Sequence, residues 1–460
     1  MSEMTSAPAE RPTGRETDEA LLSVEDLRTY FSVGASVLGR GGGVVRAVDG
    51  VSFDIHPGEV FGLVGESGSG KSTLGRSILQ LVQPTSGQVR YRGRDLVPLS
   101  DKEMRPLRRE MGLIFQDPNA ALNPAMTIVQ GVAHPLWIHG MVSSKAEARR
   151  EVATMLERVG LSPPEKFLDS YPDDLSGGQK QRLVIARALI TRPTFVVADE
   201  PVAALDMSVR ARVLELMLEL GRELGLTYLF ITHDLATARF LCDRIGILYL
   251  GNFVEWGSSE ALFGSPQHPY TRSLLEAIPL PEAGRRNRDK ILPRGEIPDA
   301  ARPPAGCRFH PRCPEAFEVC GWEGRDLVEA IEERWTQVDQ ETVDHERAVV
   351  GKLDKAEVGR ESVRLPSNTP DKLASWLQEY GPQLPSPVFT GVSEVVTDER
   401  GVVVRFRTGP EPAEQTVAGR DVACHLHGVV PRLGGVHVGD PYPADFAGYQ
   451  PPAPSWESRD

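Results

Sequence analysis

The residues from Gly65 to Ser72, GESGSGKS, have types and spacing suited to binding phosphate. They match the pattern G-x-x-x-x-G-K-[ST], whose glycines let backbone N–H groups and a helix N-terminus point at one anion. In this pattern Lys71 should reach the β- and γ-phosphates, and the Ser72 hydroxyl should bind Mg²⁺. A Gly/Ser loop can also be a plain turn, but here an apolar strand precedes it and a helical repeat follows it. We predict a nucleotide site formed by Gly65, Glu66, Ser67, Gly68, Ser69, Gly70, Lys71, Ser72 and Thr73.

Two carboxylates, Asp199 and Glu200, end the apolar segment that starts at Phe195. Beside a phosphate loop, one such carboxylate can hold Mg²⁺ and a second can polarise an attacking water. The alternative is that the carboxylates simply end the strand in solvent, which would explain one acidic residue well but two poorly. His233 ends the next apolar segment, Thr227–Thr232, where a contact to the γ-phosphate is needed, although a lone histidine there is usually structural. We predict Asp199 as a magnesium ligand, and Glu200 and His233 as catalytic residues.

Two further segments could contact a nucleotide. Ser176–Gln179 precedes an amphipathic run, so it would offer free N–H groups to an anion, although alone it is more typical of a plain helix cap. The adjacent aromatics Tyr30 and Phe31 end a predicted strand ahead of the phosphate loop, where an aromatic could stack on adenine or pack in the core. We choose Phe31 for stacking, because Tyr30 should point the other way along the strand.

These residues need a parallel sheet to bring them together, and apolar segments at suitable spacing predict one. The pattern indicates an α/β P-loop core over residues 21–279, interrupted by a helical subdomain at about 117–175. Residues 1–20 are polar and predicted to be disordered, and Gly34–Gly43 is predicted to be a loop. The strands are predicted at Leu21–Phe31, Val44–Ile55, Val60–Val64, Gln88–Tyr91, Met111–Phe115, Phe195–Asp199, Thr227–Thr232, Ile245–Tyr249 and Phe253–Glu255.

The composition limits the classes of function. The 460 residues carry a formal net charge of −13, which argues against a protein that binds nucleic acid through a basic surface. The sequence contains no run of eighteen apolar residues, and its N-terminus lacks the apolar core of a secretory signal. We expect a protein that stays in the cytoplasm, where its five cysteines would be thiols or metal ligands rather than disulfides.

In this order, the motifs resemble those of the ATP-binding subunit of an ABC transporter. The resemblance implies that Gln116 is a catalytic residue and magnesium ligand, and that Ser176, Gly177, Gly178, Gln179 and Asp206 contact nucleotide. The matching motifs are Walker A at Gly65–Ser72, the Q-loop at Gln116, the signature at Leu175–Gln179, Walker B at Phe195–Asp199 with the catalytic Glu200, the D-loop at Ala204–Asp206 and the switch histidine His233.

Other segments are similar to the oligopeptide/dipeptide importer subgroup, some of whose members are assigned to nickel or sugars. They are Gln116-Asp117-Pro118 with Leu122-Asn123-Pro124, His268-Pro269-Tyr270-Thr271 and Cys307-Arg308-Phe309-His310-Pro311-Arg312-Cys313. The resemblance implies ATP and Mg²⁺ as ligands, and peptide uptake through two separate membrane permease subunits with an extracytoplasmic substrate-binding protein. It also implies a second ATPase subunit, which we expect to be a different chain, and a peripheral position on the cytoplasmic face of the membrane.

In this family each ATP lies between one P-loop and the signature motif of the partner subunit. The Gln116 segment and the helical subdomain would contact the permeases. The alternative is a soluble ABC ATPase of DNA repair, chromosome folding or translation, but such chains usually have tandem cassettes or long coiled coils, and this sequence has one motif set and no sustained heptads. An exporter half would need membrane helices.

In the C-terminal third, the alternation of predicted strands and helices ends. Residues 280–304 are predicted to be a linker, 305–427 a small irregular Cys-containing domain with an insertion at about 321–419, and 428–460 a Pro-rich disordered tail. Within the insertion we expect a helix at Gly324–Arg334 and a hairpin made by Gly391–Thr397 and Val402–Arg407.

Four of the five cysteines gather in this region. By resemblance to peptide-importer ATPases, some of which carry such a cluster, Cys307, Cys313, Cys320 and Cys424 are predicted to bind a four-iron iron–sulfur cluster. Zinc is the main competitor and reduced thiols are the third possibility, although C-x5-C-x6-C is not the short spacing typical of zinc. Cys424 must return across the insertion, and His425 and His427 could replace it.

Overall fold

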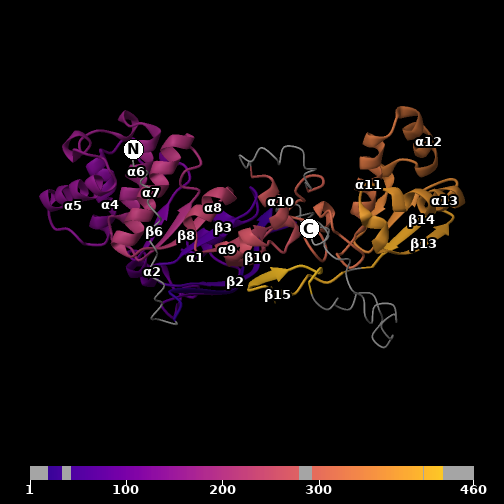
Figure 1. The fold of residues 1–460 in the computed structure, drawn as a ribbon, viewed down its shortest axis with the longest axis horizontal. Helices are drawn as coiled ribbons and strands as arrows, with labels where there is room; N and C mark the ends of the chain where they lie inside the picture. Colours follow the sequence, from indigo (N-terminus) through magenta and orange to yellow (C-terminus); the bar gives the residue numbers. More distant parts are fainter. Residues whose placement is uncertain (1–18, 34–42, 279–292, 408, 428–460) are drawn as a thin grey trace, which may run out of the picture.

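The computed structural model describes residues 19–33, 43–278, 293–407 and 409–427. The predicted disordered segments at 1–20 and 428–460, the loop at Gly34–Gly43 and the linker at 280–304 lie wholly or mostly outside these residues. The helical subdomain occupies one end of the molecule, a separate small sheet with its helices occupies the other end, and the ATPase core lies between them (Figure 1).

The central sheet has eight strands in the order β15-β16-β10-β9-β3-β8-β7-β6. Strands β6, β7, β8, β3 and β9 are parallel, whereas β10 and β16 pair antiparallel along one edge. The parallel strands are short and almost wholly buried, as expected for a sheet covered on both faces. The strand bounds are β3 Val60–Val64, β6 Met111–Ile114, β7 Phe195–Asp199, β8 Thr227–Thr232, β9 Arg244–Tyr249, β10 Asn252–Ser258, β15 Glu414–Val417 and β16 Arg420–Ala423.

A second, antiparallel sheet in the order β2-β1-β4-β5 covers one face of the central sheet, with helix α1 between the two. The apolar side chains Leu74 and Ile78 of α1 belong to a cluster with Phe61, Val197 and Ile231 of the central sheet. This packing fixes α1 at the end of β3, which is where the phosphate loop must lie. The bounds are β1 Leu22–Val33, β2 Gly43–Ile55, β4 Ser86–Tyr91, β5 Arg94–Asp95 and α1 Lys71–Ile78.

The chain between β6 and β7 is helical, apart from turns and loops, and part of it forms the helical subdomain. Its side chains Val132, Val152, Leu156 and Leu183 pack in one core that continues to the other face of the central sheet. The bounds of these elements are α3 Pro118–Ala121, α4 Ile128–Ile138, α5 Lys145–Arg158, η1 Pro164–Lys166, η2 Pro172–Asp174 and α6 Gly177–Leu189. The remaining helices around the core are α2 Asp101–Leu107, α7 Met207–Leu224, α8 Leu235–Leu241, α9 Ser259–Gly264 and α10 Pro269–Glu276.

The C-terminal region is more regular than the small irregular domain that we predicted. Its third sheet, in the order β11-β12-β14-β13, is antiparallel and packs against α11 and α13. The predicted hairpin corresponds to β13 and β14, and the predicted helix at Gly324–Arg334 to α11. The bounds are η3 His310–Arg312, α11 Gly324–Gln337, α12 Gln340–Val350, η4 Leu353–Lys355, β11 Glu357–Val358, β12 Ser362–Pro366, α13 Pro370–Tyr380, η5 Gly381–Gln383, η6 Pro387–Gly391, β13 Val392–Asp398 and β14 Gly401–Phe406.

After this third sheet, the chain returns to the core. Strand β16 pairs antiparallel with β10, with Glu255 opposite Val422 and Gly257 opposite Arg420. The Arg420 guanidinium donates to the carbonyl oxygens of Ala261 and Ser265, which further joins this hairpin to the core. Residues 414–423 therefore belong to the ATPase sheet, although we had placed them within the C-terminal domain.

Candidate nucleotide site

The phosphate loop joins β3 to α1, and its glycines occupy positions where a side chain would collide with backbone. A Cβ on Gly65 would lie 2.2 Å from the carbonyl oxygen of Leu248, and one on Gly70 would lie 2.0 Å from that of Ala47. Gly70 also has a φ of +104°, a conformation that L side chains rarely adopt. The loop can curl tightly only because these residues are glycine.

The loop also has the polar groups that a phosphate needs. Lys71 is buried, and its Nζ donates to the carbonyl oxygens of Gly65 and Glu66, each at 2.8 Å. Burial lowers the Lys71 pKa, while the charges of Glu200, Asp199 and Glu66 oppose that shift. Among the residues that the structure describes, the buried Ser69 Oγ has no hydrogen-bond partner, and the first turn of α1 holds no acidic residue. This loop therefore fits a phosphate chain.

Two of the three residues predicted to hold Mg²⁺, Ser72 and Asp199, are in contact, whereas Gln116 is hydrogen-bonded to Glu200. The Ser72 hydroxyl donates to Asp199 Oδ1 at 2.7 Å, and Arg76 Nη2 lies 3.6 Å from Asp199 Oδ2. Burial raises the pKa of Asp199, against the effect of the Ser72 hydrogen bond. A hydroxyl and a carboxylate are hard oxygen ligands of the kind that Mg²⁺ uses together with phosphates.

Glu200 is joined to both other predicted catalytic residues. Its Oε2 accepts a hydrogen bond from Gln116 Nε2 at 3.1 Å and lies 3.1 Å from His233 Nδ1. The three residues follow β6, β7 and β8, and parallel neighbours end at the same edge of the sheet. Glu200 has a φ of +44°, an uncommon conformation for a non-glycine residue and one that is frequent at functional sites.

The signature residues form the exposed N-terminus of α6. The Ser176 side chain accepts a hydrogen bond from the Gln179 N–H at 3.4 Å, and Gln179 Oε1 accepts one from the Ser176 N–H at 2.9 Å. This is the helix cap that we considered as the alternative, and it leaves Ser176 and Gly177 facing outward. In the described part of the chain, no hydrogen bond joins Ser176–Gln179 to the phosphate loop.

Asp206 forms the N-cap of α7. Its Oδ1 accepts hydrogen bonds from the Ser208 hydroxyl at 2.7 Å and from the N–H groups of Ser208 and Val209, each at 3.1 Å. The bond from the Ser208 hydroxyl, followed by the backbone bonds, lowers the Asp206 pKa. Gly178 in the signature packs against the same turn, because a Cβ there would lie 2.6 Å from Val209 Cγ1. The structure therefore brings Asp206 close to the signature helix rather than to the phosphate loop.

The two candidate adenine platforms differ in how much of the ring is free. The Tyr30 hydroxyl donates to Asp49, and the Arg46 guanidinium lies 5.8 Å from the centre of the Tyr30 ring. Phe31 is 41% exposed. Phe31 thus has an open ring face, whereas Tyr30 already has neighbours.

Comparison with known proteins assigns the family. The "ABC transporter" family model matches residues 48–203, and the model "Oligopeptide/dipeptide transporter, C-terminal region" matches residues 254–320. The oligopeptide transport ATP-binding protein AppF of Bacillus subtilis is 44% identical over 314 residues, which cover 68% of this chain and 94% of AppF. YkfD of the same bacterium is 48% identical over 313 residues, 68% of this chain and 92% of YkfD. The chain is an ABC transporter ATP-binding subunit of the oligopeptide/dipeptide import type.

Among solved structures, a bacterial ABC transporter cassette determined as a dimer is 32% identical, with a TM-score of 0.46 over 52% of this chain and 98% of the cassette. In the part of this ABC ATPase that the structure describes, no helix is both long enough and apolar enough to cross a membrane.

The four C-terminal cysteines of the ABC ATPase are buried and line one small cavity. Strand β16 ends at Ala423, so its pairing with β10 brings Cys424 back across the insertion to the other three. Burial raises the pKa of Cys307 to about 11, and burial together with the three neighbouring thiols raises that of Cys313. Four thiols therefore share one apolar enclosure.

The described residues do not show the metal-binding geometry that the predicted iron–sulfur cluster would need. Among the described residues, no group of three or more His, Cys, Asp or Glu side chains is placed to hold a metal ion. The two proposed substitutes also have other partners, since His425 Nε2 lies 3.1 Å from the Pro410 carbonyl oxygen and His427 Nε2 lies 3.1 Å from that of Gln267.

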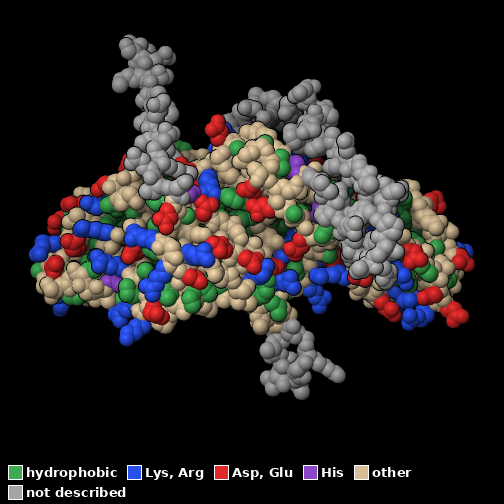
Figure 2. Space-filling view, turned by 90° about the horizontal axis from the view of Figure 1, so that it is seen from below, with side chains coloured by type: hydrophobic (Ala, Val, Ile, Leu, Met, Phe, Trp, Pro, Cys, Tyr) green, Lys and Arg blue, Asp and Glu red, His purple; other side chains and the backbone are tan. Residues whose placement is uncertain are grey.

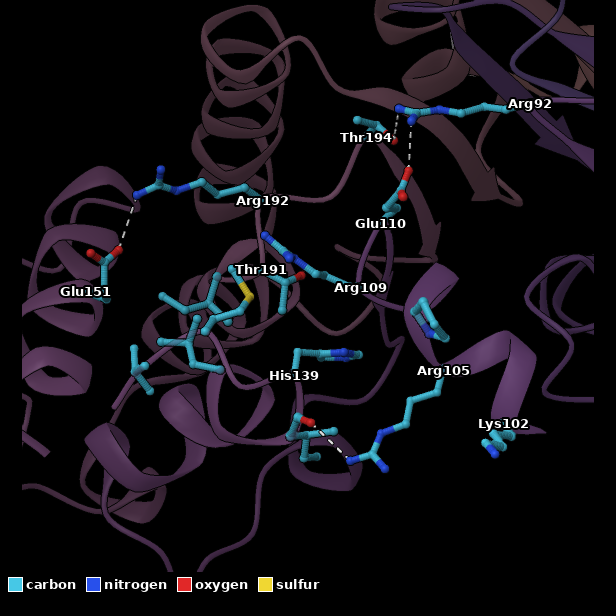
Figure 3. Close-up of a pocket in the computed structure, with 16 residues that line it drawn as sticks. Arg92, Lys102, Arg105, Arg109, Glu110, His139, Glu151, Thr191, Arg192 and Thr194 are labelled. Atoms are coloured by element: carbon cyan, nitrogen blue, oxygen red, sulfur yellow. Dashed lines mark hydrogen bonds and ion pairs between the residues drawn. The ribbon is translucent and has the colours of Figure 1, made fainter. Parts of the chain in front are cut away.

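A pocket of about 940 Å³ lies between the ATPase core and the helical subdomain. Arg92, Lys102, Arg105, Arg109 and Arg192 line it, whereas only two carboxylates do so. The Arg105 and Arg109 side chains come from the segment around α2 and face His139, which follows α4 (Figure 3). Burial and these two arginines lower the His139 pKa. Lys and Arg side chains are also more frequent on the half of the lower face that carries the helical subdomain (Figure 2).

The sequence interpretation missed the residues that support the phosphate loop from outside the core motifs. The Glu66 N–H donates to the Tyr270 hydroxyl at 3.1 Å, and Arg312 pairs with the Glu66 carboxylate. Both residues belong to segments that marked the subgroup, His268–Thr271 and Cys307–Cys313. Their location in segments specific to the subgroup was the one feature of the sequence from which this supporting role could have been inferred.

Proposed function

We propose that this ABC ATPase hydrolyses ATP to drive peptide import through separate permease subunits. The observation that carries the proposal is Glu200, which is hydrogen-bonded to Gln116, lies within hydrogen-bond distance of His233, and follows the Asp199 that contacts the phosphate loop. An acid placed in this way can accept a proton from a water that attacks phosphorus.

In the proposed reaction, the loop N–H groups and Lys71 hold the phosphates while Glu200 orients a water and takes its proton. The water oxygen attacks the γ-phosphorus, the bond from that phosphorus to the β–γ bridging oxygen breaks, and the products are ADP and phosphate. His233 contacts the γ-phosphate, and Gln116 holds Glu200 in place. Mg²⁺, held by Ser72, Asp199 and Gln116, would neutralise charge on the β- and γ-phosphates.

Replacing the base tests this proposal. Glu200→Gln keeps the shape of the side chain but removes the base, so ATP hydrolysis should fall by about 10²- to 10⁴-fold. ATP binding should persist, because the loop and Lys71 are unchanged. Glu215→Gln, a substitution on exposed α7 side-chain surface, is the matched control. Hydrolysis by Glu200→Gln at the wild-type rate would overturn the role of Glu200.

The exposed signature helix supports a paired site. It offers an N-terminus that could bind an anion but no lysine, and Ser176 and Gly177 face outward. We propose that it completes the nucleotide site of a second ATPase subunit, which is a different chain, and that its own P-loop receives the signature of that partner. The purified chain alone should then stay monomeric with ATP in the Glu200→Gln variant, and a dimer of this variant would favour a homodimer instead.

The basic pocket supports a docking site for a permease. It lies between the core and the helical subdomain, and Ile138, which lines it at the end of α4, is exposed together with the neighbouring Trp137. We propose that a short cytoplasmic segment of a permease, with acidic side chains, binds there. This would hold the subunit at the cytoplasmic face of the membrane, below permeases that receive peptide from an extracytoplasmic binding protein.

Charge reversal separates docking from hydrolysis. Arg105→Glu should abolish co-purification with the permeases in mild detergent and leave the basal ATPase rate of the isolated chain unchanged. Arg158→Glu is the control, because Arg158 lies on α5, pairs with Glu223 and does not line the pocket. Equal recovery of both variants with the permeases would place the docking site elsewhere.

We also propose that Cys307, Cys313, Cys320 and Cys424 bind a four-iron cluster. The support is four buried thiols around one cavity, which are costly to ionise without a bound metal. A four-iron cluster is held by four cysteine thiolates, which is the number of thiols around this cavity. Anaerobic purification with metal analysis should give about four irons and four sulfides per chain. One zinc, or no metal, would contradict the proposal.

A further inference from the structure

The segment between Cys307 and Cys313 contacts the phosphate loop, although the two are far apart in the sequence. Arg312, in η3, donates from Nη1 to Glu66 Oε2 at 2.7 Å and from Nη2 to Glu66 Oε1 at 3.2 Å. Two parallel hydrogen bonds between a guanidinium and a carboxylate fix direction as well as distance. Arg312 therefore determines where the Glu66 side chain lies.

Glu66 is in turn part of the frame of the loop. Its carbonyl oxygen accepts hydrogen bonds from Lys71 Nζ at 2.8 Å and from the Ser69 N–H at 3.2 Å. Its own N–H donates to the Tyr270 hydroxyl at 3.1 Å. A movement of Glu66 would therefore also shift Lys71 and the buried Ser69, which the phosphates would contact.

The ion pair is held by its surroundings. The Arg312 side chain is 10% exposed and that of Glu66 is 24% exposed. The guanidinium lies 5.9 Å from the ring centre of Tyr249 and 6.0 Å from that of Phe309, and its Nε donates to the Arg294 carbonyl oxygen at 3.3 Å. A lysine could supply the positive charge at this position, but it could make neither the two parallel hydrogen bonds nor the contacts of the planar guanidinium with the two rings.

A second arginine of the same segment reaches the other side of the nucleotide site. Arg308 donates to the Leu250 carbonyl oxygen and to Asp49, which accepts a hydrogen bond from the Tyr30 hydroxyl. Gly251, the residue after Leu250, donates to the Ser69 carbonyl oxygen at 2.9 Å. The Cys307–Cys313 segment therefore supports both the phosphate loop and the β1–β2 strand pair, which contains Phe31.

We propose that Arg312 is a positioning residue for ATP binding, which acts by holding Glu66 and hence the phosphate loop in its binding conformation. The Cys307–Cys313 segment is then a structural part of the nucleotide site. This role goes beyond the proposed function and does not depend on what the cysteines bind.

The test uses the full-length chain co-purified with its partner ATPase subunit, and it measures steady-state ATP hydrolysis. Arg312→Ala should raise KM for ATP about tenfold while kcat stays within about twofold, because the lost contact shapes the loop and not the attacking water. Arg312→Lys should give a smaller rise, since it keeps the charge without the two parallel hydrogen bonds. Arg325→Ala is the control, because Arg325 lies in the same region but bonds to Glu323 and to the Arg302 carbonyl oxygen.

A double variant shows whether the effect passes through Glu66. Glu66→Gln should raise KM on its own, and Glu66→Gln with Arg312→Ala should raise it little further. If Arg312→Ala fails to fold, Arg312→Lys and Glu66→Gln decide the question. An unchanged KM in both of these variants would overturn the proposal, as would fully multiplicative effects in the double variant. A wild-type chain that shows no ATPase activity even together with its partner ATPase subunit would instead contradict the proposed function.

Discussion

The segment Cys307–Cys313 lies between the nucleotide site and the cysteine cavity, since Arg312 contacts Glu66 while Cys307 and Cys313 line the cavity. The polar groups of the two sites are nevertheless stabilised in different ways. In the nucleotide site most of the polar side chains have partners within the chain, as Ser72 has Asp199 and Gln116 has Glu200, and Ser69 is an exception. In the cavity, burial and the neighbouring thiols raise the pKa of Cys313, and no described group there is placed to hold a metal ion.

This difference shows which kind of site is complete without a ligand. Carboxylates that accept hydrogen bonds from neighbouring residues remain compatible with folding before any nucleotide binds. Buried thiols must stay protonated or be neutralised by a bound metal. Nucleotide-site variants should therefore alter binding and rate more than the fold, whereas cysteine variants should alter metal content first.

The largest expected effect is on ATP affinity in Lys71→Ala. Lys71 is the one lysine within Gly65–Thr73, and its loss leaves the phosphate charge uncompensated, so affinity should fall about 100-fold or more. Equilibrium binding of a fluorescent ATP analogue measures this. Lys145→Ala, at the exposed start of α5, is the control. Binding by Lys71→Ala within threefold of wild type would show that the loop alone holds the phosphates.

The core of the nucleotide site was predictable because each motif adjoins a short apolar strand. Asp199, Glu200 and His233 each lie at the end of such a strand or just beyond it, and parallel pairing places these ends at one edge. The predicted strand Thr227–Thr232 agrees with β8 residue for residue. The local sequence pattern was sufficient to predict the positions of these residues, because neighbouring parallel strands bring their C-terminal ends together.

The support from the C-terminal region was not predictable in the same way. Arg312 and Glu66 are 246 positions apart, and nothing local marks an arginine as the partner of one carboxylate. The sequence also gave no sign that β16 would pair with β10, because an edge strand accepts a neighbour through backbone groups that every residue has. The strand β12 and the helices α12 and α13 were missed as well.

The second prediction tests the cysteine side of the comparison. If the cavity holds the proposed cluster, Cys424→Ser should lower bound iron and sulfide from about four per chain to near zero, because one of four thiolate ligands is lost. Cys242→Ser is the control, since Cys242 is buried in the core and does not line the cavity. Metal analysis after anaerobic purification measures both variants. Full iron content in Cys424→Ser would mean that another group ligates the metal.

The third prediction concerns adenine. If Phe31 stacks on the base, Phe31→Ala should weaken ATP binding about tenfold, because one stacked base is worth roughly 1–3 kcal/mol. Tyr30→Phe is the matched control, because it removes the hydroxyl that bonds to Asp49 and keeps the ring. Titration with ATP and with inorganic triphosphate separates the two contributions. An equal loss for both ligands in Phe31→Ala would assign the effect to the loop instead of the base.

The smallest expected effect is a pH dependence at Asp49, which the C-terminal Arg308 reaches across the strand pair. Burial alone would raise the Asp49 pKa, but hydrogen bonds from Tyr30 and Arg308 outweigh burial and hold it below the ordinary value of 3.8. A carboxyl whose pKa is lower in the folded state stabilises the fold above the unfolded pKa, and this contribution is lost as the pH falls through the folded pKa.

The free energy of unfolding should therefore differ between wild type and Asp49→Asn by an amount that is constant above about pH 5 and shrinks toward about pH 2. The asparagine cannot ionise, so the difference between the two proteins isolates this one carboxyl from the other acids of the chain. Urea unfolding of the two proteins at matched pH values measures it. A difference that stays constant down to about pH 2, or grows on acidification, would show that Arg308 and Tyr30 do not hold Asp49 ionised in the folded protein.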